Sequence, residues 1–165
     1  MKFTRRKPGD GNWSGTKSLD EVYDYIRMLD AEGYPPAFIT IGDYNIALGY
    51  EALTNNTTGN GNVAIGGGAM VDNTTGEYNT AVGKGALENN TTSDYNSAFG
   101  AWALHKNIAG GDYNTALGTN ALAGDTYGSK SVAIGREALV TQNFTTATDA
   151  LNTAVGYAAG QSVTT

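Results

Sequence analysis

A short pattern of small, apolar and glycine residues recurs along this chain from residue 45 to residue 160. In each copy a small or β-branched residue precedes Ala, a large apolar residue and Gly; two variable residues, Ala and usually Leu follow. Such regular spacing indicates structural units that stack on one another. The repeat glycines lie 17, 17, 17, 18, 17 and 21 residues apart; we expect them to mark coil turns at Gly49, Gly66, Gly83, Gly100, Gly118, Gly135 and Gly156.

This pattern favours strands over helices. A period near 17 residues is too short for a pair of helices, and glycine together with β-branched residues in every copy opposes helix formation. In a parallel β-solenoid each period forms one coil, and equivalent positions stack about 4.8 Å apart. The sequence therefore predicts an all-β fold, a parallel β-roll or β-solenoid of about seven coils over residues 42–160.

The two alanines of each copy suggest an interior so narrow that only a methyl group fits. The large apolar residue between them points the opposite way in a strand, so it needs a second burial surface. We expect these residues to line an interface between copies of the chain, most simply a homotrimer about a common axis. The alternative, with alanines between chains and large residues inside the roll, remains open at this stage. The residues in question are Leu48, Ile65, Val82, Phe99, Leu117, Ile134 and Val155.

Residues 1–41 have a different character and predict an arm followed by one short helix. Ser18 and Glu21 form a capping box at the start of that helix. Gly33 and the two prolines that follow it end the helix. About 14 residues make only a marginal free helix, so its apolar stripe must dock on a partner. The docking residues are Leu19, Val22, Ile26 and Leu29; we interpret residues 1–41 as an attachment connector and residues 161–165 as a tail.

Composition and charge exclude several classes of function. The chain has 23 glycines and no cysteine, which excludes a disulfide scaffold and a thiolate metal site. Residues 1–41 hold six basic and six acidic residues, so the net charge of −6 falls on the repeats. An acidic array is a poor binder of nucleic acid and of anionic membranes. No apolar run approaches the length of a membrane helix or a signal peptide, so we expect no membrane insertion, and release by lysis or on a virion.

The sequence gives little support for catalysis, and we expect no enzyme, cofactor or metal site. The single histidine, His105, follows Leu104 in a loop beside Lys106, and no nucleophilic set can be assembled around it. A column of acidic residues could bind Ca²⁺, although solvated turn residues are the favoured interpretation. Those residues are Asp43, Glu77, Asp94 and Asp112.

Exposed positions of the repeats are candidates for recognition. Tyrosines in the leaders before the strands are interpreted as a stacking ladder rather than a sugar platform: Tyr44, Tyr78, Tyr95 and Tyr113. Asn-x-Thr triplets match glycosylation acceptors but are also ordinary turn chemistry, the interpretation we favour, at Asn55, Asn56, Asn73, Asn89, Asn90 and Asn143. The variable positions after the repeat glycine give five possible surface contacts: Tyr50, Lys84, Trp102, Arg136 and Tyr157.

The run Ser131-Val132-Ala133-Ile134-Gly135 and its siblings resemble the head repeats of trimeric autotransporter adhesins, known as YadA-like heads. With the Tyr-Asn leaders and the Asn-Thr-Thr-Gly loops, they resemble even more the repeats of bacteriophage tail fibres. This resemblance implies a left-handed roll, a homotrimer, location on the virion, and a structural or adhesive role in attachment to the host, with a host-surface glycan as a candidate partner. The alternatives are a bacterial surface adhesin and an extracellular filament that stacks end to end.

A second resemblance covers residues 2–39, which are similar to the segment after the catalytic domain in formyltransferase-like enzymes. The catalytic residues of those enzymes lie upstream of this segment and have no counterpart here. The resemblance suggests a borrowed connector, which in a tail fibre would join another tail or baseplate protein. A hexapeptide-type acyltransferase is a less favoured alternative, since only one hexad per coil, such as residues 48–53, fits that repeat.

Overall fold

The computed structural model describes residues 44–164. The helix and the docking residues that the sequence predicts within residues 1–41 lie outside the described part, as does Asp43. They therefore remain predictions.

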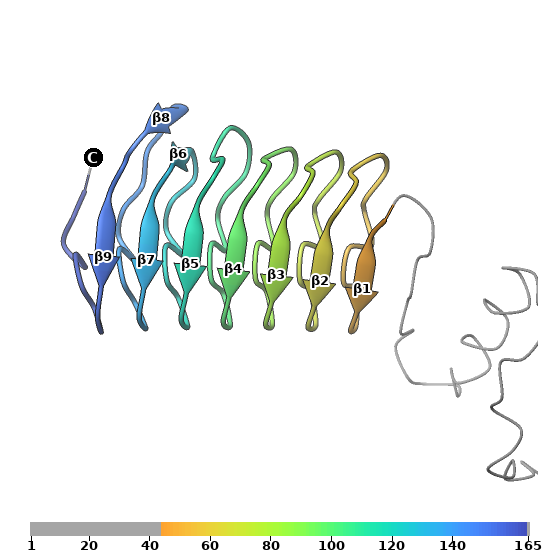
Figure 1. Cartoon of the computed structure of the whole chain (residues 1–165), viewed down its shortest axis with the longest axis horizontal. Helices are drawn as coiled ribbons and strands as arrows, with labels where there is room; N and C mark the ends of the chain where they lie inside the picture. The colour runs from red at the N-terminus through yellow and green to blue at the C-terminus, as the bar shows by residue number, and fades with distance from the viewer. Residues whose placement is uncertain (1–43, 165) are drawn as a thin grey trace, which may run out of the picture.

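The described chain is a parallel β-solenoid, and no helix occurs in residues 44–164 (Figure 1). One strand from each repeat joins a seven-stranded parallel sheet in the order β1-β2-β3-β4-β5-β7-β9. These strands are β1 (Ile46–Leu48), β2 (Val63–Ile65), β3 (Thr80–Val82), β4 (Ser97–Phe99), β5 (Thr115–Leu117), β7 (Val132–Ile134) and β9 (Thr153–Val155). The predicted all-β parallel solenoid is confirmed.

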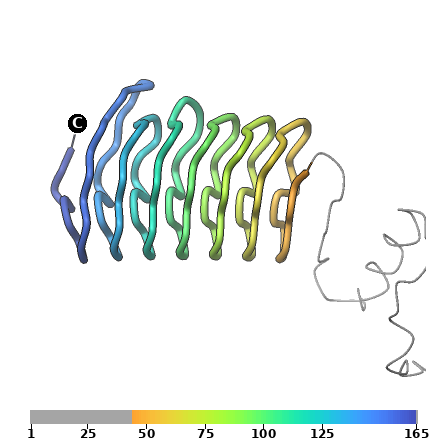
Figure 2. Tube along the Cα trace, viewed as in Figure 1, coloured from red at the N-terminus to blue at the C-terminus, as the bar shows by residue number. Residues whose placement is uncertain are grey.

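Equivalent residues of successive repeats lie directly beside one another along the rod. Ala64 pairs with Ala81, and Ala81 pairs with Ala98, so the repeat register of the sequence is the register of the sheet. Between the first and last strands the chain makes about six turns rather than the seven coils expected, because seven strands enclose six intervals (Figure 2).

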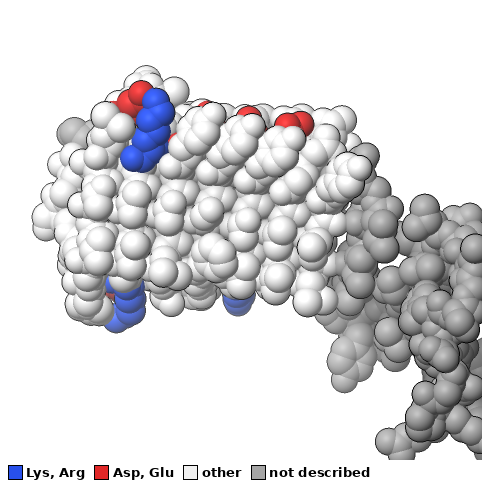
Figure 3. Space-filling model, in the orientation of Figure 1, with Lys and Arg blue, Asp and Glu red and all other residues white. Residues whose placement is uncertain are grey.

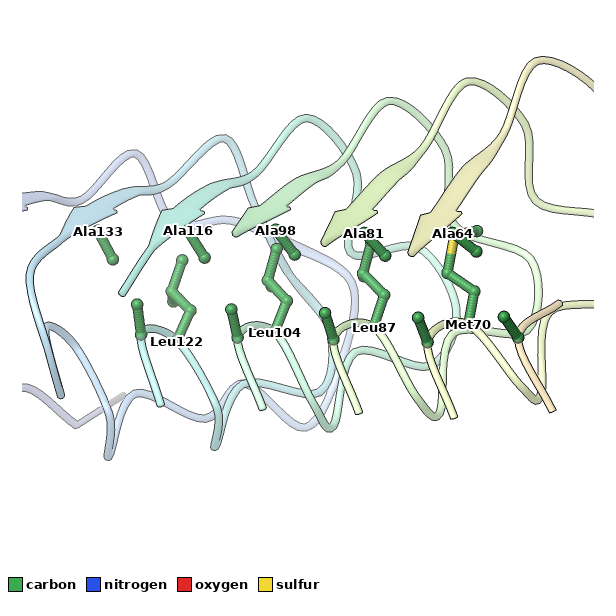
Figure 4. Close-up of a cluster of buried hydrophobic side chains, with 14 of the residues drawn as sticks. Ala64, Met70, Ala81, Leu87, Ala98, Leu104, Ala116, Leu122 and Ala133 are labelled. Atoms are coloured by element: carbon green, nitrogen blue, oxygen red, sulfur yellow. The ribbon is translucent and has the colours of Figure 1, made fainter. Parts of the chain in front are cut away.

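The interior of the roll is filled by alanines and by one longer side chain in each full turn. The strand alanine and the alanine after the repeat glycine are buried throughout the middle turns; Ala81 and Ala86 are two of them. Opposite the strand alanines, leucines or a methionine reach across the interior, as Figure 4 shows for Met70 and Leu87. The prediction that only methyl groups fit is therefore wrong in this respect. The buried long side chains are Leu53, Met70, Leu87, Leu104, Leu122 and Leu139.

The large apolar residues of the strands point away from this interior. Leu48 is 50% exposed and Val155 is 67% exposed, while the strand alanines between the outer positions are buried. The alternative in which large strand residues fill the roll and alanines face other chains is therefore wrong for this fold.

A left-handed backbone conformation makes the tight turns possible. All seven repeat glycines have φ between 127° and 136°, a region that residues with a Cβ rarely adopt. A Cβ on Gly83 would lie 2.6 Å from the carbonyl carbon of Gly100 in the next turn. Glycine is required here both by the backbone conformation and by the close approach of the next turn.

The longest loop adds a second, smaller sheet. The spacing of 21 residues before the last repeat glycine leaves room for β8 (Thr148–Asp149), which pairs in parallel with β6 (Gly128–Ser129). The additional length is accommodated away from the main sheet, whose register continues unchanged from β7 to β9.

Candidate interaction surfaces

The outer side of the seven-stranded sheet is an apolar surface that runs the whole length of the rod. We call it the sheet face. It consists of the outward residues of each strand, and none of them is charged. In Figure 3 most of the surface over the strands likewise shows no charged atom. The large apolar residues of this face are Ile46, Leu48, Val63, Ile65, Val82, Phe99, Leu117, Val132, Ile134 and Val155; those exposed by 40% or more are Ile46, Leu48, Phe99, Leu117 and Val155.

One margin of the sheet face follows the repeat glycines, and we call it the glycine margin. The five predicted surface contacts all lie here: Tyr50, Trp102 and Tyr157 are 54%, 40% and 70% exposed, and Lys84 and Arg136 are also exposed. The Lys84 Nζ lies 5.5 Å from the centre of the Trp102 ring, a cation–π contact between successive turns. The carboxylate of the neighbouring Glu51 raises the pKa of Tyr50.

Arg136 on this margin is held by contacts within its own chain. Its guanidinium lies 5.6 Å from the centre of the Tyr157 ring and 2.7 Å from the Glu137 carboxylate. The structure therefore orders two cation–aromatic pairs along the glycine margin, one at the level of β3 and β4 and the other at β7 and β9.

The opposite margin precedes the strands, and we call it the leader margin. The rings of Tyr78, Tyr95 and Tyr113 stack with centres 5.2 and 5.0 Å apart and interplanar angles of 12° and 2°. The predicted stacking ladder is thus confirmed for these three. The pKa of Tyr95 is raised, first because its hydroxyl is partly shielded from solvent and then because of the charge on the neighbouring Tyr113 and Tyr78 phenols. Their faces cover one another, so this ladder exposes ring edges rather than a flat sugar platform.

The acidic residues beside the tyrosine ladder form hydrogen bonds between successive turns. The Asp94 Oδ1 accepts the backbone N–H of Glu77 at 2.7 Å, and the Asp112 Oδ1 accepts that of Asp94 at 2.9 Å. Each carboxylate thus connects its turn to the preceding one. No group of three or more His, Cys, Asp or Glu residues able to hold a metal ion occurs in residues 44–164.

Buried asparagines form two ladders that the sequence interpretation did not anticipate. In the inner ladder, the Asn62 Oδ1 accepts the backbone N–H of Asn79, and the Asn79 amide donates to the Ser93 carbonyl at 2.8 Å. In the outer ladder, the Asn73 amide donates to the Asn56 Oδ1, and the Asn90 amide donates to the Asn73 Oδ1, both at 2.8 Å. Asn73 and Asn90 are fully buried, which supports turn chemistry over glycosylation at these two positions.

The inner ladder has one defect, and an extra residue explains it. The Asn96 amide nitrogen is buried without a hydrogen-bond partner in the described structure. In the regular turns the corresponding amide reaches a carbonyl 14 residues ahead, as Asn62 does at Gly76. The turn after Asn96 is one residue longer, and the Gly111 carbonyl accepts instead from Asn107 and Asn114.

This defect predicts unequal effects of two equivalent substitutions. Asn79→Ala removes two hydrogen bonds, one donated by the side-chain nitrogen and one accepted by the side-chain oxygen. Asn96→Ala removes a side chain whose nitrogen donates no hydrogen bond. We expect Asn79→Ala to lower the free energy of unfolding by about 1 kcal/mol more than Asn96→Ala. Urea denaturation followed by circular dichroism measures both. Equal losses would contradict the structural explanation.

The ladder changes chemistry near the last turns. Asp125 and Gln142 stand where asparagines stand earlier, and both are buried. The Asp125 carboxylate accepts from the Gln142 amide at 2.5 Å and from the backbone N–H groups of Gly128 and Phe144 at 3.0 and 3.2 Å. These bonds attach the long last loop to the solenoid. Local turn propensity alone gives no sign of this role.

His105 lies beside the acidic residue Glu88. Its Nε2 is 3.4 Å from a Glu88 carboxylate oxygen of the preceding turn, and both side chains are partly exposed. His105 is therefore less exposed than a free loop residue.

Comparison with known proteins gives one match. A model of the family described as methionyl-tRNA formyltransferase, C-terminal domain, matches residues 8–65. No curated protein and no solved structure matches the chain. The match covers about a third of the sequence and includes β1 and β2, so it extends from the N-terminal segment into the first turn of the solenoid. Within the described residues, no helix is long and apolar enough to cross a membrane.

Proposed function

We propose that this chain is a non-catalytic fibre protein of a phage tail, in which three copies pack through their sheet faces to form a stiff shaft that attaches the virion to its host. The single observation that carries the proposal is the sheet face itself. It exposes large apolar side chains along the whole rod and bears no charged residue. Contiguous exposed apolar surface of this kind marks an interaction site.

Identical copies are the partner that best fits such a face. The outward positions repeat in every turn, so two identical rods lying side by side repeat the same contact at each level. A closed ring of three rods around one axis buries every sheet face at once. The resemblance to YadA-like heads and tail fibres adds the left-handed sense of the roll and the attachment role.

The stacked interior supplies the stiffness that a shaft requires. Strand pairing ties each turn to the next, the two asparagine ladders add bonds between most of the turns, and the tyrosine stack adds contacts across three of them. Assembly of three such rods would also present any terminal binding site in three copies, which raises avidity. Residues 1–41 would join the shaft to another tail or baseplate protein, and a host-surface glycan is the candidate receptor.

Charge placed on the sheet face should abolish assembly. Val82→Lys combined with Leu117→Lys would bury six charges at the centre of a trimer, where they lack partners. We expect the molar mass from light scattering to fall from three chains to one at equal concentration. Thr92→Lys, on an exposed loop far from the strands, is the matched control and should leave the mass unchanged. A wild-type mass of one chain in native buffer would refute the trimer.

The biological setting needs a separate measurement. Antibody labelling of purified virions should decorate the tail if the protein is a fibre component. Labelling of bacterial surfaces alone would favour the surface adhesin, and filaments that lengthen with concentration would favour end-to-end stacking. Removal of residues 1–41 should prevent incorporation into particles while leaving the number of chains in the shaft unchanged.

A further inference from the structure

We infer that the two margins of the sheet face meet between copies, so that Lys84 of one copy faces Glu77 of the next, with the rods parallel and level. This inference rests on the proposed assembly through the sheet face. It adds the specific polar contact between the copies, which does not follow from an apolar stripe alone.

The position of the two residues follows from the short strand between them. Strand β3 has three residues; Glu77 comes three residues before it on the leader margin, and Lys84 comes two residues after it on the glycine margin. Both residues therefore belong to the same turn, at opposite ends of one strand. Lys84 is exposed and Glu77 is partly exposed, so both can reach a neighbouring rod.

The two margins differ in charge. The leader margin holds Glu77, Asp94 and Asp112 in three successive turns. At the same levels the glycine margin holds Lys84 and no acidic residue in the two positions after each repeat glycine. In Figure 3, acidic atoms lie along one edge of the surface over the strands, together with one basic group near the C-terminal end of the rod, and further basic atoms lie at the opposite edge. Opposite margins therefore attract, whereas two leader margins repel.

Symmetry converts this preference into an orientation. When copies are related by rotation about an axis along the rod, each glycine margin meets a leader margin at the same height, because a closed ring permits no axial shift. An antiparallel pair instead brings like margins together. The acidic leader margins then face one another across the pair, which is unfavourable.

Neighbouring contacts hold the Lys84 side chain and the Glu77 backbone in place. Lys84 lies 5.5 Å from the Trp102 ring centre, which restricts its freedom, and the backbone of Glu77 is tied to Asp94 at 2.7 Å. Arg136 is already engaged by Glu137 and Tyr157 in its own chain, so Lys84 is the stronger candidate for the contact.

Cysteine cross-linking tests the orientation directly, because the sequence contains no cysteine. A Glu77→Cys and Lys84→Cys double variant, treated with a short bismaleimide, should give covalent trimers on a denaturing gel. A link within one chain leaves the mass of one chain and is therefore distinguishable. Ala101→Cys is the matched control: it lies on the glycine margin beside β4, the middle strand, so two copies bring these cysteines together only in an antiparallel pair.

Charge reversal tests the contact itself. Lys84→Glu and Glu77→Lys should each raise the concentration at which trimers dissociate by about tenfold, since each creates three like-charged pairs. Combining both reversals in one chain should restore most of the loss. Circular dichroism establishes that each variant is folded.

The outcomes separate this inference from the proposed assembly. A monomeric wild type would overturn both the Lys84–Glu77 contact and the proposed assembly. A trimer that gives no links between positions 77 and 84 would overturn the contact and leave the assembly through the sheet face intact. Covalent dimers from Ala101→Cys would show an antiparallel pair and overturn both the contact and the trimer about one axis. Failure of the combined reversal to recover assembly would overturn the Lys84–Glu77 contact.

Discussion

Replacing Gly83 with alanine is expected to cost more than about 4 kcal/mol of the free energy of unfolding, an exceptional loss for one methyl group. The added Cβ would lie 2.6 Å from both the carbonyl carbon and the carbonyl oxygen of Gly100, and the backbone φ of 136° is itself unfavourable for alanine. The clash involves backbone on both sides, so no side chain can rotate to relieve it. Denaturant unfolding followed by far-ultraviolet circular dichroism measures the loss.

Gly156→Ala separates the two causes. Gly156 has a similar φ of 130°, but the nearest atom to its added Cβ is the Ala159 Cβ at an ordinary 3.8 Å. We expect only the conformational cost there, about 1–3 kcal/mol. If both variants lose the same stability, the contact between successive turns is not the reason for glycine at this position.

Truncation of one interior leucine is the second large effect that we expect. Leu104 is fully buried in the middle of the roll, where it faces the strand alanines (Figure 4). Leu104→Ala should lower the free energy of unfolding by about 2–5 kcal/mol, because the rigid turns cannot close on the space left behind. Chemical denaturation of the purified variant measures this change.

Leu117→Ala is the matched control, with the same chemical change on the other side of the sheet. Leu117 is 47% exposed on the sheet face of the single chain. At concentrations low enough to keep the chains apart, its truncation should change stability far less than Leu104→Ala does. A larger loss for Leu117→Ala under these conditions would mean that the inside and outside of the roll have been exchanged.

The sequence repeat was sufficient to predict the solenoid, and it favoured the direction of the strand side chains without excluding the opposite arrangement. Alternation within three residues places Ala81 inside and Val82 outside, and the structure has them so. The interior leucines were missed because alternation stops at the repeat glycine. After it, positive φ values such as 55° at Trp102 and 51° at Leu104 turn the chain back across the roll.

The polar ladders could not be predicted by local reasoning. Asparagine is common in turns because its side chain bonds to backbone groups a few residues away. This local preference does not distinguish Asn79 and Asn90 from any other asparagine in a loop. Their burial depends on bonds to residues 14 or 17 positions away. Strict spacing of asparagines at the solenoid period was the available signal. The contact surfaces between chains depend on partners outside the single chain, and the sequence indicates them only through exposed apolar residues.

The segment from the leader position, which is asparagine in every repeat except for Ser131, to the position of the interior leucine is nine residues long in all seven repeats, as in Asn79–Leu87. Every change in spacing falls in the remaining part of the turn, which has one extra residue before Asn114 and four before Asn152. Both extensions leave the seven-stranded sheet in register. Insertions can therefore accumulate on one side of the rod during evolution while the opposite side stays flat enough to pack against a neighbour.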